Sequence, residues 1–285
     1  MCTTIFRLAI LCAMIATGVN PSLAEGVYVP AQNAIAASPH IGRTAGDGEV
    51  KSKVASLRFV TTDDFPPYSF LDGQGNLTGY NVELARRICE TLVIACTIQV
   101  RPFALMVQTL REDKADASIA GIKDTPALRH YLAYTMPYLR LPARFVTARS
   151  GVTIDGPDSL AGKTVAVASH GRYEDFLTDF FPRAQRAPMA STEDALAAVK
   201  AGKVDAAFAG AVDAAFWMAG PSAADCCRFS GGVYTEAAYF GDGMTIAVAA
   251  GNDDLRRVLD GAIASLDSDG TLADLAARFF PADLH

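Results

Sequence analysis

The chain has 285 residues, of which 51% are hydrophobic, and its formal net charge is −6. This length and apolar content suffice for two modest lobes with separate hydrophobic cores. The acidic balance argues against a nucleic-acid partner, because binding to phosphates depends on basic surfaces.

The first 24 residues have the pattern of a secretory signal peptide. Arg7 is their only charged residue, and it precedes the apolar run LAILCAMIA and the small residue Ala24. That run is too short to span a bilayer, so we expect cleavage after Ala24 and export. Residues 25–55 are rich in Ala, Gly, Ser and Pro and lack periodicity, which predicts a flexible lead-in.

The first predicted strand, at residues 57–62, stops at two consecutive prolines. Pro66 and Pro67 cannot donate ladder hydrogen bonds, so they end the strand and fix the loop that follows it. An apolar-periodic helix is predicted over residues 80–92. Because Phe65 stands where the strand ends, we expect its ring to face a cleft rather than the core.

The chain also contains an internal repeat. The segments KADASIAG (114–121) and KVDAAFAG (203–210) share the pattern K-x-D-A-x-x-A-G. Each follows an apolar helical stretch and continues as a short buried strand of small and apolar residues. Two copies at this distance predict two lobes built on one helix–strand plan.

The remaining segments fit two α/β lobes. Strands are predicted at 96–102 and 162–169, and helices at 171–181 and 271–280. Strands that alternate with helices favour a mostly parallel sheet in each lobe. Ligands of such sheets bind at the carboxyl ends of the strands, so the site is expected in the cleft between the lobes.

Four cysteines follow the predicted signal peptide, in two pairs. Cys89 ends a predicted helix and Cys96 begins the next strand, so a disulfide between them is geometrically reasonable in an oxidising compartment. Cys226 and Cys227 are adjacent, and the strain of a bond between neighbours favours two free thiols over a vicinal disulfide. No histidine lies at a ligand spacing near a cysteine, so we expect neither a metal site nor a cofactor.

These segments together resemble the family-3 bacterial extracellular solute-binding proteins, the periplasmic receptors of polar amino-acid ABC transporters. The resemblance runs in order from residue 57 to the C-terminus, through LRFVTTDDFPPYSFLDGQGNLTGYNVELARRI, LREDKADASIAGIKDTP, SLAGKTVAVASHGRYEDFL and YFGDGMTIAVAAGNDDLRRVL. It implies the α/β, two-lobed periplasmic binding protein type II fold, each lobe a mostly parallel sheet flanked by helices, with two crossing strands between them. Lobe 1 would comprise residues 56–141 and 245–285, and lobe 2 would comprise residues 142–244.

The resemblance implies a function as well. Members close their lobes on a small polar solute and deliver it to the permease of an ABC importer. We therefore expect a monomeric periplasmic solute-binding protein that is not an enzyme. Two alternatives stay open: an accessory protein of a periplasmic oxidoreductase system, and an enzyme resembling cyclohexadienyl dehydratase in which Glu174 acts as an acid. The spacing of Cys89 and Cys96 also resembles the disulfide of the branch that binds basic amino acids.

The ligand site implied by the resemblance combines aromatic, backbone and basic groups. Phe65 and Phe103 would stack on the ligand, while Lys123 and Arg172 would hold a carboxylate, the latter at a helix N-terminus that already favours anions. Backbone groups at four further positions would donate or accept hydrogen bonds: Ala120, Gly121, Gly171 and Gly210.

The sequence departs from the family at both charged anchors of an amino acid. Leu128 stands where the family has an arginine for the carboxylate, and Gly210 stands where it has an aspartate for the ammonium group. Asp213 lies one helical turn further on and is a candidate substitute. Thr62 replaces another aspartate that binders of basic amino acids use. With two basic residues in the predicted site, the sequence favours a compact organic anion or an acidic amino acid over a basic one.

Overall fold

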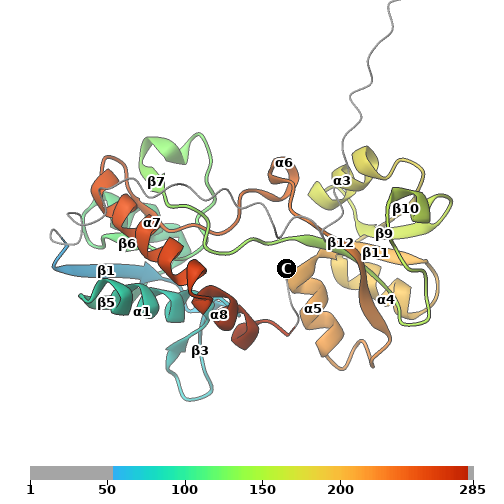
Figure 1. The fold of residues 1–285 in the computed structure, drawn as a ribbon, viewed down its shortest axis with the longest axis horizontal. Coiled ribbons are helices and arrows are strands. Elements are labelled where there is room, and N and C mark those ends of the chain that lie inside the picture. The colour runs from blue at the N-terminus through green and yellow to red at the C-terminus, as the bar shows by residue number, and fades with distance from the viewer. Residues whose placement is uncertain (1–53, 282–285) are drawn as a thin grey trace, which may run out of the picture. The chain divides into compact units, whose positions relative to one another are not determined.

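The computed structural model describes residues 54–281, so the predicted signal peptide and nearly all of the predicted lead-in lie outside the described residues. The described chain contains two five-stranded sheets and one three-stranded sheet, with helices packed on the two larger sheets (Figure 1). None of the helices in this part of the chain has the length and hydrophobicity that a bilayer crossing requires.

The first five-stranded sheet and its helices form what we call lobe 1. The strand order is β5-β1-β6-β13-β7, in which β1 runs parallel to β5 and β6, and β13 runs antiparallel to β6 and β7. The strands are β1 (Ser56–Thr61), β5 (Ala95–Val100), β6 (Ala117–Ser118), β7 (Leu132–Tyr134) and β13 (Ala247–Ala249). The helices are α1 (Tyr80–Leu92), α7 (Asp253–Ser268) and α8 (Thr271–Phe279) on one core, and α2 (Met106–Arg111) on the other. Along β1, Leu57 and Phe59 enter the first core and Val60 enters the second, as the alternation of a strand requires.

The second five-stranded sheet and its helices form lobe 2. The strand order is β10-β9-β11-β8-β12, in which β9 runs parallel to β10 and β11, and β8 runs antiparallel to β11 and β12. The strands are β8 (Ala143–Ala148), β9 (Thr164–Ala168), β10 (Gln185–Met189), β11 (Ala206–Gly210) and β12 (Cys227–Tyr234). The helices are α3 (Arg172–Phe180) and α6 (Ala237–Phe240) on an aromatic core, and α4 (Thr192–Lys200) and α5 (Ala211–Ala219) on the opposite core.

The repeat seen in the sequence is a structural repeat. Strands β6 and β11, which come from the two K-x-D-A-x-x-A-G segments, occupy the central position of their sheets. Each follows a helix, α2 or α4, and each lies between a parallel and an antiparallel neighbour. The two-lobed α/β fold is therefore confirmed, with mixed sheets in which one strand, β13 or β8, runs antiparallel to both of its neighbours and the other four strands run in one direction.

The chain crosses between the two sheets twice, and the crossing segments contact each other. Leu139 and Met244 form an isolated antiparallel bridge, in which the Met244 N–H donates to the Leu139 carbonyl at 2.8 Å. Gly243 has a φ of +118°, and a Cβ there would lie 2.5 Å from the same carbonyl oxygen, so this approach requires glycine. We keep the predicted lobe boundaries, 56–141 with 245–285 and 142–244, as a proposal.

All four cysteines in the described residues form disulfides. Cys89 and Cys96 are bonded, with their Cα atoms 6.1 Å apart, which confirms the predicted bridge. Cys226 and Cys227 are bonded as well, so the expectation of two free thiols is wrong. The strain of a vicinal bond was the only basis of that expectation. In the structure Cys227 is buried at the start of β12, and the Cys226 carbonyl accepts the Arg149 N–H at 2.9 Å, which fixes this stretch beside β8.

Candidate functional site

The double-proline loop, Phe65–Tyr68, caps the N-terminus of α1. The Pro67 carbonyl accepts the Tyr80 N–H at 3.0 Å, and the Tyr68 carbonyl accepts the Asn81 N–H at 2.8 Å. A helix N-terminus leaves its first N–H groups unpaired, and α1 has no side-chain cap, so the loop supplies the missing acceptors. Pro67 suits this role because it contributes a carbonyl and has no N–H of its own to satisfy.

Phe65 lies at the edge of this loop and is 39% exposed. It belongs to β2 (Asp64–Phe65), which pairs with β3 (Ser69–Leu71), and β3 pairs with β4 (Leu77–Thr78) in the three-stranded sheet. Its ring centroid is 4.6 Å from that of Tyr68, and a Cβ added at Gly121 would lie 3.3 Å from the ring. Protein atoms thus support the ring on one side, and the rest of the ring faces a pocket.

On lobe 2, the end of β11 forms a second wall around Gly210. A Cβ added at Gly210 would lie 2.5 Å from the Tyr173 hydroxyl oxygen and 3.3 Å from Oδ2 of Asp213. The tyrosine hydroxyl therefore occupies the space that a side chain at position 210 would need. The Arg172 guanidinium lies 5.0 Å from the centroid of the Tyr173 ring and donates to its hydroxyl at 3.0 Å.

Asp213 is the acidic group of this wall. It lies in the first turn of α5, and although part of its surface is exposed, desolvation by its surroundings raises the pKa of its carboxyl group. The positive charge of Arg172 acts in the opposite direction on that pKa. On lobe 1, burial raises the pKa of the Tyr68 hydroxyl, and the charges of Asp213 and Tyr173 raise it further. Tyr68 and Asp213 are therefore close enough to interact electrostatically.

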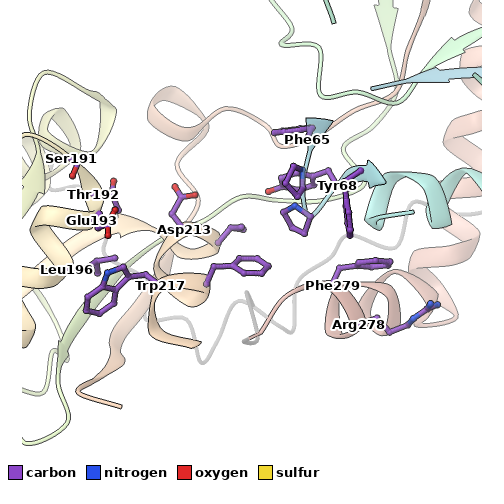
Figure 2. Close-up of a pocket in the computed structure, with 15 residues that line it drawn as sticks. Phe65, Tyr68, Ser191, Thr192, Glu193, Leu196, Asp213, Trp217, Arg278 and Phe279 are labelled. Atoms are coloured by element: carbon purple, nitrogen blue, oxygen red, sulfur yellow. The ribbon is translucent and has the colours of Figure 1, made fainter. Parts of the chain in front are cut away.

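A pocket of about 910 Å³ lies between the Phe65–Tyr68 loop on one side and the first turns of α4 and α5 on the other. Figure 2 shows Phe65, Tyr68 and Phe279 on one side, and Asp213 and Trp217 on the other. Aromatic rings from both sides dominate the lining, which also carries acidic and basic groups. The full lining consists of Phe65, Pro66, Pro67, Tyr68, Phe70, Ser191, Thr192, Glu193, Leu196, Val212, Asp213, Phe216, Trp217, Arg278 and Phe279.

The predicted ligand contacts of lobe 1 lie in different surroundings. Phe65 lines the pocket, and Gly121 supports its ring from behind. Ala120 is buried in the core around α2, so only its backbone can contact a ligand. Lys123 is exposed, and its carbonyl accepts the Tyr134 hydroxyl. Phe103 is 53% exposed in the short 3₁₀ turn before α2 and is not among the residues that line the pocket.

The predicted contacts of lobe 2 gather at the start of α3 and the end of β11. Gly171 is the N-cap of α3, and Arg172 is its first residue. Gly210 is the N-cap of α5 and is buried. Arg172 and Gly210 both adjoin Tyr173, so the structure brings them together through a residue that the sequence analysis did not single out.

The residues at which the sequence departs from the pattern of the family that it resembles make contacts within the protein. Leu128 packs against the core around α2. The next residue, Arg129, pairs with Asp124, with Nε to Oδ1 at 2.7 Å. Thr62 is 2% exposed, and its hydroxyl lies 3.3 Å from that of Ser69. The charged side chains that line the pocket stand at other positions, Glu193, Asp213 and Arg278, and Arg172 and Tyr173 are not among its lining residues.

Comparisons with known proteins agree with this architecture. The family model for bacterial extracellular solute-binding proteins, family 3, matches residues 57–282. The ABC transporter arginine-binding protein 1 of Escherichia coli (strain K12) is 25% identical over 231 residues, covering 81% of this chain and 93% of that protein. The histidine-binding periplasmic protein of the same strain is 25% identical over 232 residues, covering 81% and 89%.

Solved structures show the same fold. The L-cystine solute receptor of Neisseria gonorrhoeae, in its unliganded open conformation, matches with a TM-score of 0.69 and 21% identity, covering 82% of this chain and 96% of that one. The family match spans both sheets, the crossing segments and both walls of the pocket. The chain belongs to the bacterial extracellular solute-binding proteins, family 3.

Proposed function

We propose that the protein is a periplasmic receptor that binds an amino acid in the pocket between Phe65 and Asp213 and delivers it to the permease of an ABC importer. The observation that carries this proposal is the pocket itself, which combines aromatic rings with the carboxylate of Asp213. Its volume of about 910 Å³ lies within the range of small-molecule sites. Relatives that bind arginine or histidine and are named as transporter or periplasmic proteins support the same class of ligand.

The two walls suit binding by lobe closure. Phe65 and Tyr68 come from lobe 1, whereas Asp213 and Trp217 come from α5 of lobe 2. A ligand that contacts both walls stabilises the state in which they are close, and the importer can recognise that state. In this scheme Arg172, at the N-terminus of α3, holds the ligand carboxylate, with Lys123 on lobe 1 as a second cation. Phe103 and the backbone of Ala120, Gly121, Gly171 and Gly210 complete the proposed contacts.

Asp213 changes the charge that we expect of the ligand. The preference for an organic anion or an acidic amino acid followed from basic groups without an acidic counterpart in the predicted site. The Asp213 carboxylate, whose pKa responds to the charge of Arg172, gives the site both signs of charge, which an amino acid matches better than a dicarboxylate does.

We infer that the protein acts as a monomeric binding protein rather than as an enzyme. The candidate acid of the enzymatic alternative, Glu174, accepts the backbone N–H of His170 at 2.7 Å through Oε2. Glu174 thus caps the start of α3 and is not among the residues that line the pocket, whereas an acid catalyst must reach the substrate. Incubation with prephenate or arogenate should therefore yield no decarboxylated product.

A thermal-shift screen tests the proposed function. The exported chain is mixed separately with each of the twenty L-amino acids, succinate and 2-oxoglutarate. At least one amino acid should raise the melting temperature, because ligand at one hundred times its Kd adds about 2.7 kcal/mol to stability. Neither dicarboxylate should match it. If no amino acid shifts the melting temperature, or if only the dicarboxylates do, the proposal is wrong.

A further inference from the structure

The disulfide between Cys226 and Cys227 is a feature that the proposed function does not use. It joins neighbouring residues, whose Cα atoms are 3.7 Å apart, so it closes a ring formed by these two residues alone. Disulfides stabilise proteins mainly by restraining the unfolded chain, and this effect is smallest for the shortest loops. The bond therefore acts on the local geometry of the folded chain rather than as a staple between distant segments.

The turn that leads into this disulfide has an unfavourable backbone conformation. Ala224 and Asp225 have φ angles of +49° and +58°, in the left-handed region that residues with a Cβ rarely adopt. Such residues persist only where the surrounding contacts hold them. Arg149 supplies two of these contacts, since its backbone N–H donates to the Cys226 carbonyl and its Nε to the Asp225 carbonyl, both at 2.9 Å. The disulfide holds the end of the same turn, so the bond and Arg149 together fix the connection from α5 to β12.

The disulfide also packs on the same hydrophobic core as one wall of the pocket. Cys227 is buried in the lobe 2 core beneath α4 and α5, and Cys226 packs against that core. Leu196 of α4 and Trp217 of α5 belong to the same cluster and line the pocket, and Figure 2 shows both on its lobe 2 side. Closely packed side chains transmit small displacements to their neighbours. A change at the disulfide therefore reaches the pocket through a single packed cluster.

Cys226 is the accessible end of the bond. It is half-buried and follows two exposed residues, Ala224 and Asp225, whereas Cys227 is buried. A ring formed by two neighbouring cysteines is strained, and strained or exposed disulfides are the ones that thiols reduce readily. We therefore expect an incoming thiolate to attack the sulfur of Cys226.

We propose that this disulfide is a redox switch for the wall of the pocket that carries Trp217. A thiolate of a dithiol reductant attacks Sγ of Cys226 and breaks the bond between the two sulfurs, and Cys227 leaves as a thiolate that takes up a proton. The second thiolate of the reductant then attacks its own sulfur in the mixed disulfide, and Cys226 leaves in the same way. The protein gains two electrons and two protons, and the dithiol, which has lost them, becomes a disulfide.

Reduction weakens ligand binding in this mechanism, and to that extent the inference rests on the proposed function. Without the bond, Cys226 and Cys227 rotate independently, the left-handed turn relaxes, and Trp217 loses a fixed packing partner. A wall that must be ordered when the ligand binds consumes part of the binding free energy. We expect the affinity of the reduced protein to be lower by about fivefold or more, the lower end of the coupling between two distinct sites.

Graded reduction tests the first step. The native exported chain is equilibrated with increasing dithiothreitol, alkylated with iodoacetamide and analysed as peptides by mass spectrometry. Cys226 and Cys227 should be alkylated at a lower concentration of dithiothreitol than Cys89 and Cys96, whose bond joins α1 to β5. At that concentration acrylamide should quench the emission of Trp217, the one tryptophan in the sequence, more strongly than before reduction, because the loosened wall exposes its ring.

Two double substitutions assign the effect to one disulfide. Cys226→Ser with Cys227→Ser should show the quenching and the lowered affinity of the reduced wild type, and neither should change further with dithiothreitol. Cys89→Ser with Cys96→Ser is the matched control, which should bind as the oxidised wild type does and respond to dithiothreitol in the same way. Calorimetry with the amino acid that raises the melting temperature measures the affinities. If the first variant does not fold, the oxidised and reduced forms of the control make the same comparison.

The switch is wrong if any of three results is found. These are opening of the vicinal disulfide only at concentrations that also open the other one, acrylamide quenching of Trp217 that is unchanged by reduction, and a Kd that is unchanged by reduction. An oxidised chain that binds none of the twenty amino acids contradicts the proposed function instead. In that case the alkylation and the quenching still decide whether reduction loosens the wall.

Discussion

Replacing Gly79 with alanine should lower the free energy of unfolding by about 3 kcal/mol or more, the range of a severe backbone conflict. Gly79 has a φ of +121°, a conformation that residues with a Cβ rarely adopt. An added methyl group would collide with the carbonyl of Tyr68 and lie 2.9 Å from the Ser69 nitrogen. Because these are backbone atoms, no side-chain movement can relieve the collision. Denaturant unfolding measures the loss.

The same substitution should weaken ligand binding, because Tyr68 caps α1 through the carbonyl that the methyl group displaces. Gly73→Ala is the matched control in the neighbouring turn. No atom lies within 4 Å of a Cβ at Gly73, and its φ is not in the positive range, so stability should change little. Equal effects of the two substitutions would show that the contact between Gly79 and Tyr68 does not hold the loop.

Phe65→Ala should weaken amino-acid binding by about 10- to 100-fold, which corresponds to the 1.5–3 kcal/mol of burying one phenylalanine side chain. Its effect on the stability of the ligand-free chain should stay well below the 3–5 kcal/mol typical of a core phenylalanine, because 39% of Phe65 is already exposed. Calorimetric titration and thermal unfolding measure the two effects.

Phe180→Ala is the control for Phe65→Ala. Phe180 is 43% exposed, stacks on Phe176 at 4.5 Å, and is not among the residues that line the pocket. It should leave the affinity unchanged. A Phe65→Ala variant that binds as tightly as the wild type, or that loses as much stability as a core deletion, would show that Phe65 is a structural residue.

Much of the fold could be predicted because the residue patterns that indicate it lie within short segments of the sequence. The helix predicted at residues 80–92 is α1 (Tyr80–Leu92), since its apolar periodicity is strong and a glycine precedes it. The K-x-D-A-x-x-A-G repeat predicted two lobes of one plan, and β6 and β11 occupy equivalent places in their sheets. The disulfide between Cys89 and Cys96 followed from a helix and a strand that meet over a short connection.

The site was harder to predict, because its key contacts join residues that are distant in the sequence. Nothing local in GRYEDF indicates that the Tyr173 hydroxyl reaches the space beside Gly210. The carboxylate of Asp213 becomes a pocket group only when α5 and the Phe65–Tyr68 loop come together. The vicinal disulfide was missed for a related reason. The hydrogen bond that fixes Cys226 comes from the backbone N–H of Arg149, which follows β8 and is distant in the sequence.

The most direct test of the proposed pocket uses the protein's own fluorescence. Trp217 is the one tryptophan in the sequence, and it lines the pocket on α5 (Figure 2). Titration with the amino acid that raises the melting temperature should produce a saturable change in tryptophan emission, with the same Kd as calorimetry. Calorimetric binding that leaves the emission of Trp217 unchanged at saturation would contradict the account, because the ligand would then bind away from the wall that carries Asp213.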